Sequence, residues 1–536
     1  MFSSFMCAAT MTPVLVLLIS AALNSASSSE NSTGKNFILA FPENIAYYFP
    51  GSTTNKIQIT ALLNGTKVSV TSQVVNCTKD LSAGDTEELR YDSKVELNKS
   101  EISQNILKIT SNENLSVHAI SLKHTSMQTA LIIPEDKLGT KYFIPPIPTI
   151  QGTTDQVNEA VTERQSFKII IINAGQTNTV TVGGKLSKTM KLQPYEVGQM
   201  YMNDSYRTVS AEYPMAVGFG HSCAIRHNCT CGLLYTMLPP AQEEKLKFYI
   251  PPALAEDAQA ETFVLLADGE STKVEKYNPD KPMVEYAGSA ILYRPGLLLS
   301  LIPEQDFAAC FLINTVDGAK IFATIVVNED HTDGVRIGTS PLTGPAWTPL
   351  EKNYVSVKVL LETNKNVIWH TSSKMAVYFV GSKDGTPFGN PAPVISKFPD
   401  FRGCTVTPEV VHIGPADGWR ESLQYCKDQQ LELISFPDAA DHQKQIYEKI
   451  NQIRDDSLKR VWIGMRRSSL TGEWYWLNKQ PVSKTDWANG EPGSAQDGQC
   501  AIMRADGSED FGWSDEECCS DARPVCLGPP TLFPTG

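Results

Sequence analysis

The sequence has few of the features that mark a nucleic-acid-binding protein or an enzyme. Lys and Arg together number 46 against 59 Asp and Glu, so the formal net charge is −13, and nucleic acids and anionic membranes are unfavourable partners for such a chain. Histidine is scarce, at 8 of 536 residues. The sequence contains neither an H-E-x-x-H zinc motif nor a G-x-x-x-x-G-K-[ST] phosphate loop. We therefore expect a binding protein and not an enzyme, with no nucleic-acid partner.

Long apolar runs are also scarce. One run, from Val14 to Leu23, is followed by small residues; it is too short to span a bilayer and has the length of a signal-peptide core, although no Lys or Arg precedes it. We expect residues 1–26 to be a signal peptide, no membrane span elsewhere, and a mature protein that is secreted and extracellular.

Cysteine and asparagine patterns agree with export. Twelve cysteines are present, and Cys7 lies in the expected signal peptide. An exported chain pairs its cysteines as disulfides, and the remaining odd number leaves one thiol free or bonded to another chain, which would give a covalent oligomer. N-x-[ST] glycosylation acceptors occur at Asn31, Asn64, Asn76, Asn98, Asn114, Asn203 and Asn228.

Residues 35–395 have the pattern of β-structure, with short apolar runs broken by Gly, Asn and Pro. Three stretches predict similar β-hairpins: KIQITALLNGTKVSVT from Lys56, FKIIIINAGQTNTVTV from Phe167 and ACFLINTVDGAKIFATI from Ala309. Turns such as Asn-Gly and Asp-Gly tolerate the positive φ of tight hairpins. The turn at 267–269 suggests a further, degenerate unit. The pattern predicts a multidomain chain whose N-terminal part is an all-β repeat of sandwich- or propeller-like modules.

This region resembles the N-terminal domain of the IgGFc-binding protein family. The resemblance depends on FILAFPEN near Phe37, on LGTKYFIPP, and on GHSCAIRHNCTCGLLYTMLPP from Gly220. The family name implies recognition of immunoglobulin Fc, but no residue here is diagnostic of it. We expect a role in extracellular adhesion or mucus-like assembly.

The segment HSCAIRHNCTC invites two other interpretations. Its Cys and His residues have the close spacing of zinc ligands, but in an exported chain we expect disulfides to Cys77 or Cys310 instead. GHSCA also imitates the nucleophile elbow of a hydrolase, with Ser222 at its centre. That motif requires a strand that turns into a helix, and the flanking sequence is β-rich.

Residues 384–403 are rich in Pro and Gly and predict a linker. After it, Asp417 is a candidate cap for a helix that buries Trp419, Leu423 and Cys426. A second helix is predicted from about Pro437 to Arg454, followed by aromatic-rich strands. This pattern predicts an α+β domain.

Residues 402–527 resemble a C-type lectin-like domain, followed by a tail at 528–536. VWIGM from Val461 matches the WIGL strand of that family, GWSDEEC from Gly512 matches its WND segment, and PVC ends the domain. The resemblance implies two disulfides, Cys426–Cys526 and Cys500–Cys518. We expect the two remaining cysteines of this part, Cys404 and Cys519, to pair with each other.

Sugar-binding members of that family hold Ca²⁺ through a Glu-Pro-Asn or Gln-Pro-Asp triplet and the WND segment. The equivalent candidates for a degenerate calcium site here are Glu491, Asp497, Ser514 and Asp515, of which Glu491 and Asp515 would also contact carbohydrate. Three positions depart from the pattern: Gly493, Gly498 and Ser514 replace oxygen ligands. Because Ca²⁺ takes six to eight oxygens, the alternative is that Glu491 and Asp515 are solvated carboxylates on an intact scaffold.

Two functions remain open at this point. The first is a secreted recognition protein that binds glycans or glycoproteins through the C-type lectin-like domain, in innate defence or mucosal adhesion. The second is a calcium-independent protein-interaction or structural component of mucus or extracellular matrix, with other extracellular proteins as partners.

Overall fold

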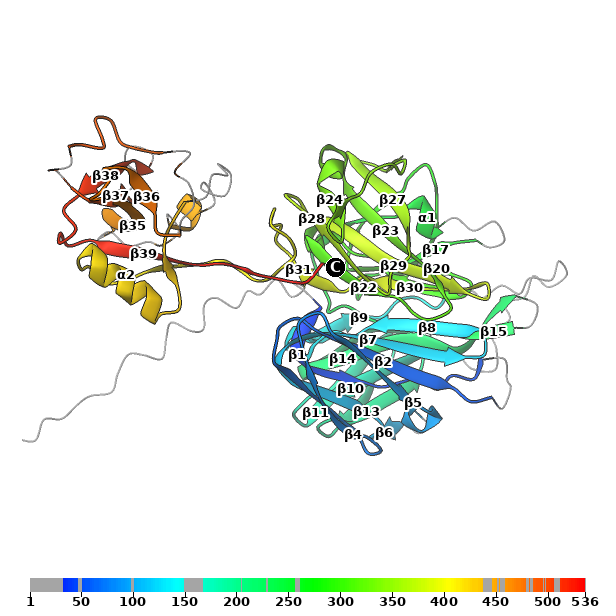
Figure 1. Cartoon of the computed structure of the whole chain (residues 1–536). Helices are drawn as coiled ribbons and strands as arrows, with labels where there is room; N and C mark the ends of the chain where they lie inside the picture. The colour runs from blue at the N-terminus through cyan, green and yellow to red at the C-terminus, as the bar shows by residue number, and fades with distance from the viewer. Residues whose placement is uncertain are drawn as a thin grey trace, which may run out of the picture. The chain divides into compact units, whose positions relative to one another are not determined.

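A computed structural model places most of the chain in two compact units. Unit 1 comprises Met1–Cys404 and Phe533–Gly536, and unit 2 comprises Thr405–Leu532 (Figure 1). The structure describes residues 32–46, 51–97, 101–148, 167–203, 205–227, 230–255, 261–436, 446–450, 453, 458–478, 482, 485–494, 496, 498–505 and 511–535. The expected signal peptide at 1–26 lies outside the described residues.

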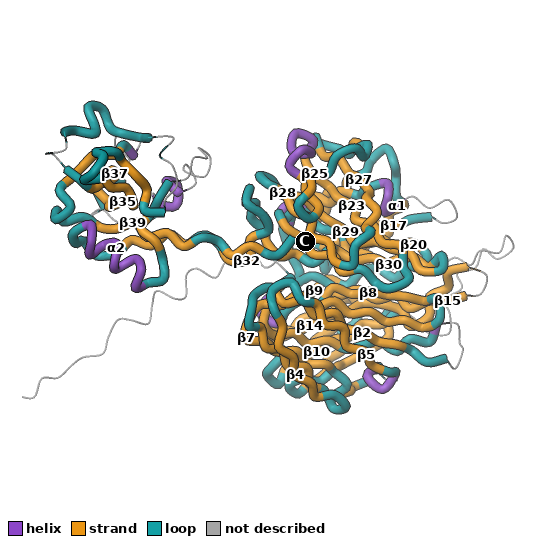
Figure 2. The backbone as a smooth tube through the Cα atoms, in the orientation of Figure 1, coloured by secondary structure: helices purple, strands orange, loops and turns teal. Residues whose placement is uncertain are grey.

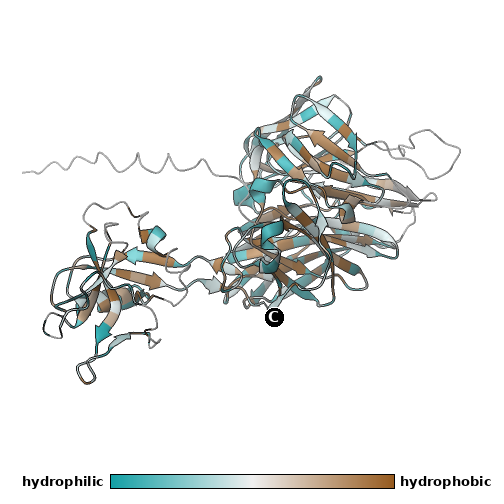
Figure 3. Cartoon of the chain, turned by 90° about the horizontal axis from the view of Figure 1, so that it is seen from above, coloured by the Kyte–Doolittle hydropathy of each residue, from teal (hydrophilic) through white to brown (hydrophobic). Residues whose placement is uncertain are grey.

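Strands dominate both units (Figure 2). Apolar residues concentrate on these strands (Figure 3), as expected where alternate side chains face a core. None of the helices in the ranges above has the length and apolar character that crossing a membrane requires.

Unit 1 contains four repeats of one strand topology, which we name repeats A (54–131), B (168–237), C (245–300) and D (310–391). Repeat A consists of β2 (Thr54–Ala61), β3 (Thr66–Thr71), β4 (Asn76–Leu81), β5 (Thr86–Tyr91), β7 (Leu107–Lys123) and β8 (Ser126–Leu131). Repeat B consists of β10 (Lys168–Asn173), β11 (Asn178–Gly184), β12 (Lys188–Leu192), β13 (Val197–Tyr201), β14 (Tyr206–His227) and β15 (Thr230–Met237). The strand orders β4-β3-β7-β2-β5 and β12-β11-β14-β10-β13 are equivalent, and β8 and β15 pair with β7 and β14.

Repeats C and D keep this order but divide it between two sheets. Repeat C consists of β16 (Lys245–Tyr249), β17 (Phe263–Ala267), β18 (Thr272–Lys276), β19 (Met283–Ala287), β20 (Ser289–Arg294) and β21 (Leu297–Ser300). Repeat D consists of β22 (Cys310–Asn314), β23 (Lys320–Asn328), β27 (Tyr354–Leu361), β28 (Lys365–His370), β29 (Met375–Lys383) and β30 (Thr386–Pro391). Repeat C has β18-β17-β20-β21 in one sheet and β16-β19 in another, and repeat D has β27-β23-β29-β30 and β22-β28. The turn at 267–269 connects β17 to β18 and therefore belongs to repeat C, the further unit that the sequence suggested.

Further strands extend these sheets, and one short helix, α1 (Pro252–Ala255), follows β16 in the chain. The strands are β1 (Thr33–Leu39), β6 (Ile102–Ser103), β9 (Gly139–Phe143), β24 (Val335–Ile337), β25 (Ser340–Pro341), β26 (Thr348–Pro349) and β31 (Val394–Ser396). β1 pairs with β7, and β9 pairs with β14.

The predicted hairpins are wrong in their pairing, although their strands are present. β2 and β3 both pair with β7, which lies between them, and β14 separates β10 from β11 in the same way. In repeat D, β22 and β23 lie in different sheets. The local turn signal is real, since Gly65 and Gly318 have φ of 71° and 74°. A strand that follows later in the chain takes the position that a hairpin partner would occupy.

The buried clusters join the four repeats into a closed ring. One cluster contains residues of repeats A and B, a second those of B and C, and a third those of C and D. The fourth contains repeat D together with Ile120 and Met127 of repeat A. β8 contacts β15 and β30, and β21 contacts the same two strands, so the last strand of each repeat surrounds the centre of the ring.

Two expectations near the end of unit 1 are wrong. The predicted linker at 384–403 contains β30, which pairs with β29, and β31, which pairs with β22; its Pro and Gly residues lie within and beside short strands. The expected tail at 528–536 contains β40, and Phe533 is buried, with its N–H bonded to the Cys404 carbonyl.

Unit 2 contains the helix α2, a helical segment at 446–450, a seven-stranded sheet and a two-stranded sheet among the described residues. Its elements are β32 (Thr405–Thr407), β33 (Val410–Ile413), α2 (Trp419–Asp428), β34 (Glu432–Leu433), β35 (Arg460–Arg467), β36 (Trp474–Trp476), β37 (Cys500–Arg504), β38 (Trp513–Glu516), β39 (Arg523–Gly528) and β40 (Thr531–Leu532). The larger sheet has the order β33-β39-β35-β37-β38, with β34 beside β39 and β36 beside β35. Trp462, Trp476 and Trp513 are fully buried in it.

The helix α2 buries Trp419 and Cys426 as predicted, whereas Leu423 is only half-buried. The cap of the helix also differs from the prediction. Gly418 is the N-cap residue, and no side chain caps the helix. Asp417 instead exchanges two backbone hydrogen bonds with Ala522, which places it in an extended pairing one residue before the cap. Most of the predicted second helix lies outside the described residues. The part that is described, 446–450, is helical.

Candidate functional site

The candidate site is the segment 486–494, which lies beside β38. Trp513 N–H donates to the Asp486 carbonyl at 2.7 Å, and Ala488 N–H donates to the Trp513 carbonyl at 2.8 Å. The Trp487 ring lies 6.0 Å from the Trp513 ring and 4.9 Å from the Trp474 ring. These contacts attach the segment to the buried core, so the residues that follow it are held near Ser514 and Asp515.

Glu491 and Asp515 are brought together by this arrangement. Both are half-buried, and the Glu491–Pro492 peptide bond is cis. Burial, followed by the neighbouring Asp515 carboxyl, raises the pKa of Glu491 above its usual range. Asp515 Oδ2 is buried and has no hydrogen-bond partner among the described residues. Two adjacent carboxyl groups of this kind favour a proton or a cation between them.

Gly493 connects Asp515 to an arginine that the sequence did not single out. Gly493 N–H donates to Asp515 Oδ1 at 2.8 Å, and Arg467 Nη2 donates to the Gly493 carbonyl at 3.0 Å. Arg467 is buried, and its guanidinium lies 5.0 Å from the centre of the Trp474 ring. An arginine at the end of a strand has the sequence pattern of a surface charge, so no local signal would have identified its role. These two hydrogen bonds connect the loop to Arg467 on β35 and to Asp515 on β38.

The structure describes two of the three other positions considered for calcium, Ser514 and Gly498. Ser514 lies on β38 opposite Ile502, and Asp497 lies outside the described residues. At Gly498, a Cβ atom would lie 2.4 Å from Glu516 N and 2.6 Å from Glu516 O. Because the backbone of β38 fills that space, no acidic side chain fits there.

The fit of this site to Ca²⁺ is therefore partial. The orphaned Asp515 oxygen and the adjacent Glu491 carboxyl suit a cation, but six to eight oxygens are needed. Within the described part of the chain, no group of three or more His, Cys, Asp or Glu residues is arranged to hold a metal.

The two disulfides that the C-type lectin-like resemblance implies are both present in unit 2. Cys426 bonds to Cys526 and joins α2 to β39, and Cys500 bonds to Cys518 next to the candidate site. The predicted Cys404–Cys519 bond is wrong, because Cys404 is buried and bonds to Cys310 of repeat D. Cys519 is exposed and free.

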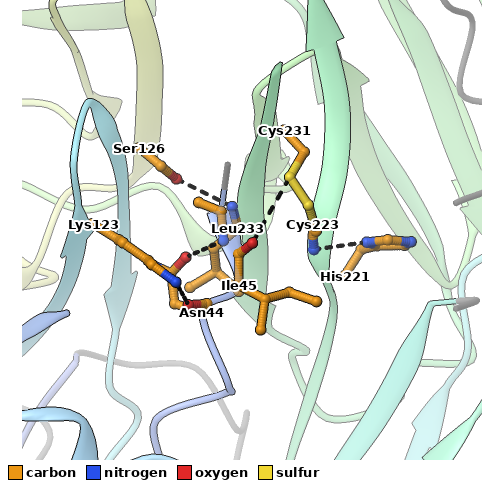
Figure 4. Close-up of a disulfide and its surroundings, with 9 residues drawn as sticks. Asn44, Ile45, Lys123, Ser126, His221, Cys223, Cys231 and Leu233 are labelled. Atoms are coloured by element: carbon orange, nitrogen blue, oxygen red, sulfur yellow. Dashed lines mark hydrogen bonds between the residues drawn. A yellow bond between two sulfur atoms is a disulfide. The ribbon is translucent and has the colours of Figure 1, made fainter. Parts of the chain in front are cut away.

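The described residues of the segment HSCAIRHNCTC lie on the paired strands β14 and β15 (Figure 4). Cys223 bonds to Cys231, because the pairing of β14 with β15 brings them together; the expected bonds to Cys77 or Cys310 are wrong. His221 is buried, and its Nδ1 accepts from the Cys223 N–H at 3.0 Å. Ser222 lies within β14, so no strand-to-helix elbow exists there. Cys77 is half-buried and free, and Cys229 lies outside the described residues.

Four of the seven predicted glycosylation acceptors are described. Asn64, Asn76 and Asn203 are exposed and Asn114 is half-buried. Asn31, Asn98 and Asn228 lie outside the described residues.

Comparison with known proteins identifies the C-terminal part. Residues 416–527 match the family model of the lectin C-type domain. C-type mannose receptor 2 from Homo sapiens is 27% identical over 119 residues, which cover 22% of this chain and 8% of that protein. Human lithostathine is a structural match with 21% identity and a TM-score of 0.21, covering 22% of this chain and 90% of that one.

A second similarity accounts for more of the chain. IgGFc-binding protein from Homo sapiens is 27% identical over 251 residues, which cover 44% of this chain. This chain spans only 4% of the length of that relative. The chain thus combines a lectin C-type domain with a similarity to IgGFc-binding protein.

Proposed function

We propose that this chain is a secreted, extracellular binding protein and that unit 2 binds a carbohydrate or a glycoprotein through residues 486–494 and β38. The lectin C-type match over 416–527 supports binding as the activity. The names of two relatives, which refer to mannose and to immunoglobulin Fc, point to glycan and glycoprotein ligands. The four disulfides suit an extracellular setting.

The observation that carries this proposal is the carboxyl pair of Glu491 and Asp515. Their oxygens can accept hydrogen bonds from sugar hydroxyls. Among the described residues, Asp515 Oδ2 has no donor other than the Glu491 carboxyl in its protonated form. Burying such an oxygen without a partner is unfavourable, so a ligand hydroxyl that donates to it gains free energy. Calcium, when bound, would supply additional coordination of the same hydroxyls.

The second candidate function is calcium-independent binding of a protein partner. It is favoured by the hydrogen bonds from Arg467 through Gly493 to Asp515, which fix the loop without a metal. In this case the loop is a preformed surface, and chelation of calcium leaves binding unchanged.

A glycan array with the full secreted chain tests the first proposal. We expect selective glycan binding that Asp515→Ala abolishes, whereas Glu517→Ala, an exposed acid on the same segment, leaves it intact. Absence of binding to any glycan, with and without calcium, would overturn the proposal and leave protein partners as the ligands.

Calorimetric calcium titration separates the two candidates. Heat that saturates with the wild type and disappears with Asp515→Ala favours calcium-assisted sugar binding. Ligand binding that persists in EDTA, with no calcium heat, favours the calcium-independent function.

A further inference from the structure

A cavity lies at the centre of the ring in unit 1 and takes residues from all four repeats. Its volume is about 190 Å³. Leu131 of repeat A, Met237 of repeat B, Ala290 of repeat C and Asn390 of repeat D are among its lining residues. Since each repeat contributes, the cavity exists only in the closed ring.

Side-chain hydrogen bonds join the inner strands around this cavity. Gln128 Nε2 on β8 donates to the Tyr235 carbonyl on β15 at 3.1 Å. The hydroxyls of Thr236 on β15 and Ser300 on β21 lie 3.2 Å apart, and the Asn390 amide on β30 donates to the Thr129 hydroxyl on β8. These bonds connect repeat A to B, B to C, and D to A. The wall of the cavity is therefore pre-organised.

The lining of the cavity is mainly apolar. Phe143 and Phe248 are buried beside it, whereas Leu131, Ile133 and Ile302 are only partly buried and line the same space. A cavity of about 150 Å³ with an apolar lining binds benzene in another protein, so this volume suits a ligand of one or two rings. Water gains little in such a space because it finds few polar partners.

One polar atom in the cavity specifies the ligand further. Ser289 Oγ is buried and has no hydrogen-bond partner in the described structure, and Ser289 lines the cavity. A hydroxyl in this position donates to an acceptor such as a carbonyl oxygen. The cost of leaving it unpaired is recovered when a ligand supplies that acceptor.

We propose that the central cavity binds a small, uncharged, mainly apolar molecule of one or two rings that carries one hydrogen-bond acceptor for Ser289. This site is separate from the lectin C-type domain, and its ligand need not be a sugar. The binding is non-covalent and involves no reaction.

The test uses the naphthyl ketone Prodan, whose fluorescence shifts to the blue when it enters an apolar site, with the full chain. We expect saturable binding by the wild type. Ile302→Trp fills the cavity and should weaken binding by at least about tenfold, whereas Leu360→Trp, at an exposed position, should leave it unchanged. Ser289→Ala should weaken binding about three- to tenfold through loss of one hydrogen bond.

Two further comparisons keep the result decisive. Circular dichroism shows whether Ile302→Trp folds as the wild type does. If it does not, Ile133→Trp is used in its place, because Ile133 lines the same cavity from another segment. A hydrocarbon competitor, 2-ethylnaphthalene, should displace Prodan from the wild type and from Ser289→Ala with equal affinity. The proposal is overturned if the wild type shows no saturable signal, or if a folded cavity-filling variant binds Prodan as the wild type does.

Discussion

Gly493 and Asp515 are joined by a hydrogen bond of 2.8 Å from the glycine N–H to the carboxylate Oδ1. Gly493 follows Glu491 and Pro492, so it stands where the Glu-Pro-Asn triplet of the resemblance has an Asn side chain. Here the backbone N–H of the glycine contacts Asp515 instead. Its carbonyl accepts from the buried Arg467. The loop is therefore held to unit 2 through Arg467 on one side and Asp515 on the other.

Replacement of this arginine tests that connection. Arg467→Ala should destabilise unit 2 by about 1 to 3 kcal/mol, because it leaves the Gly493 carbonyl without its donor and removes packing against Trp474. The adjacent Arg466 is exposed, so Arg466→Ala is the matched control and should cost less than about 0.5 kcal/mol. Differential scanning calorimetry of the full chain measures both; equal losses for the two arginines would contradict the assigned role of Arg467.

The Glu491–Asp515 pair predicts how stability depends on pH. Burial and Asp515 raise the pKa of Glu491 in the folded chain, so its protonated form is favoured there. Its contribution to stability is fully present below the unfolded-state pKa and is lost as the pH rises through the raised, folded-state value. In EDTA, Glu491→Gln should raise the melting temperature of unit 2 by about 2 °C at pH 7 and change it little at pH 4. A lower melting temperature for the variant at pH 7 would refute the assigned interaction.

Gly498 stands where the resemblance implies an acidic calcium ligand. We predict that replacing it with Asp cannot restore that ligand. Gly498→Asp places a Cβ atom within 2.4 Å of the Glu516 backbone, and overpacking of this kind costs about 1 to 3 kcal/mol. Gln496→Asp introduces the same charge at an exposed position two residues earlier and should be neutral. Urea unfolding followed by tryptophan fluorescence measures both variants. Tighter calcium binding by Gly498→Asp, without destabilisation, would show that β38 can move to admit the acid.

Much of unit 1 could be predicted from the sequence, but its strand pairing could not. Apolar runs and turn residues are local signals, and they correctly indicated β2 with β3 and β10 with β11 as consecutive strands. The insertion of β7 and β14 between them depends on residues far along the chain, which no local pattern records. The closure of the ring by Ile120 and Met127 against repeat D is non-local in the same way.

In the candidate site, the resemblance to the C-type lectin-like domain supplied the prediction. It implied Glu491 and Asp515 as calcium and sugar ligands, and the structure places the two carboxyls next to each other. Arg467 was missed because burial, and not residue type, gives it its role. Cys404 was assigned to the wrong partner because disulfide pairing depends on three-dimensional proximity, and its partner Cys310 lies 94 residues away.

Among the described residues two cysteines are free, and they differ in exposure, which predicts which of them would link two chains. Cys519 is exposed and Cys77 is half-buried on β4. Since thiol reactivity requires access, iodoacetamide should label Cys519 in the native chain at least about tenfold faster than Cys77. If two chains are linked, Cys519→Ser should remove the dimer band from a non-reducing gel, while Cys77→Ser should leave it. A dimer that survives Cys519→Ser would assign the link to another cysteine, and peptide mass mapping of the band would identify which one.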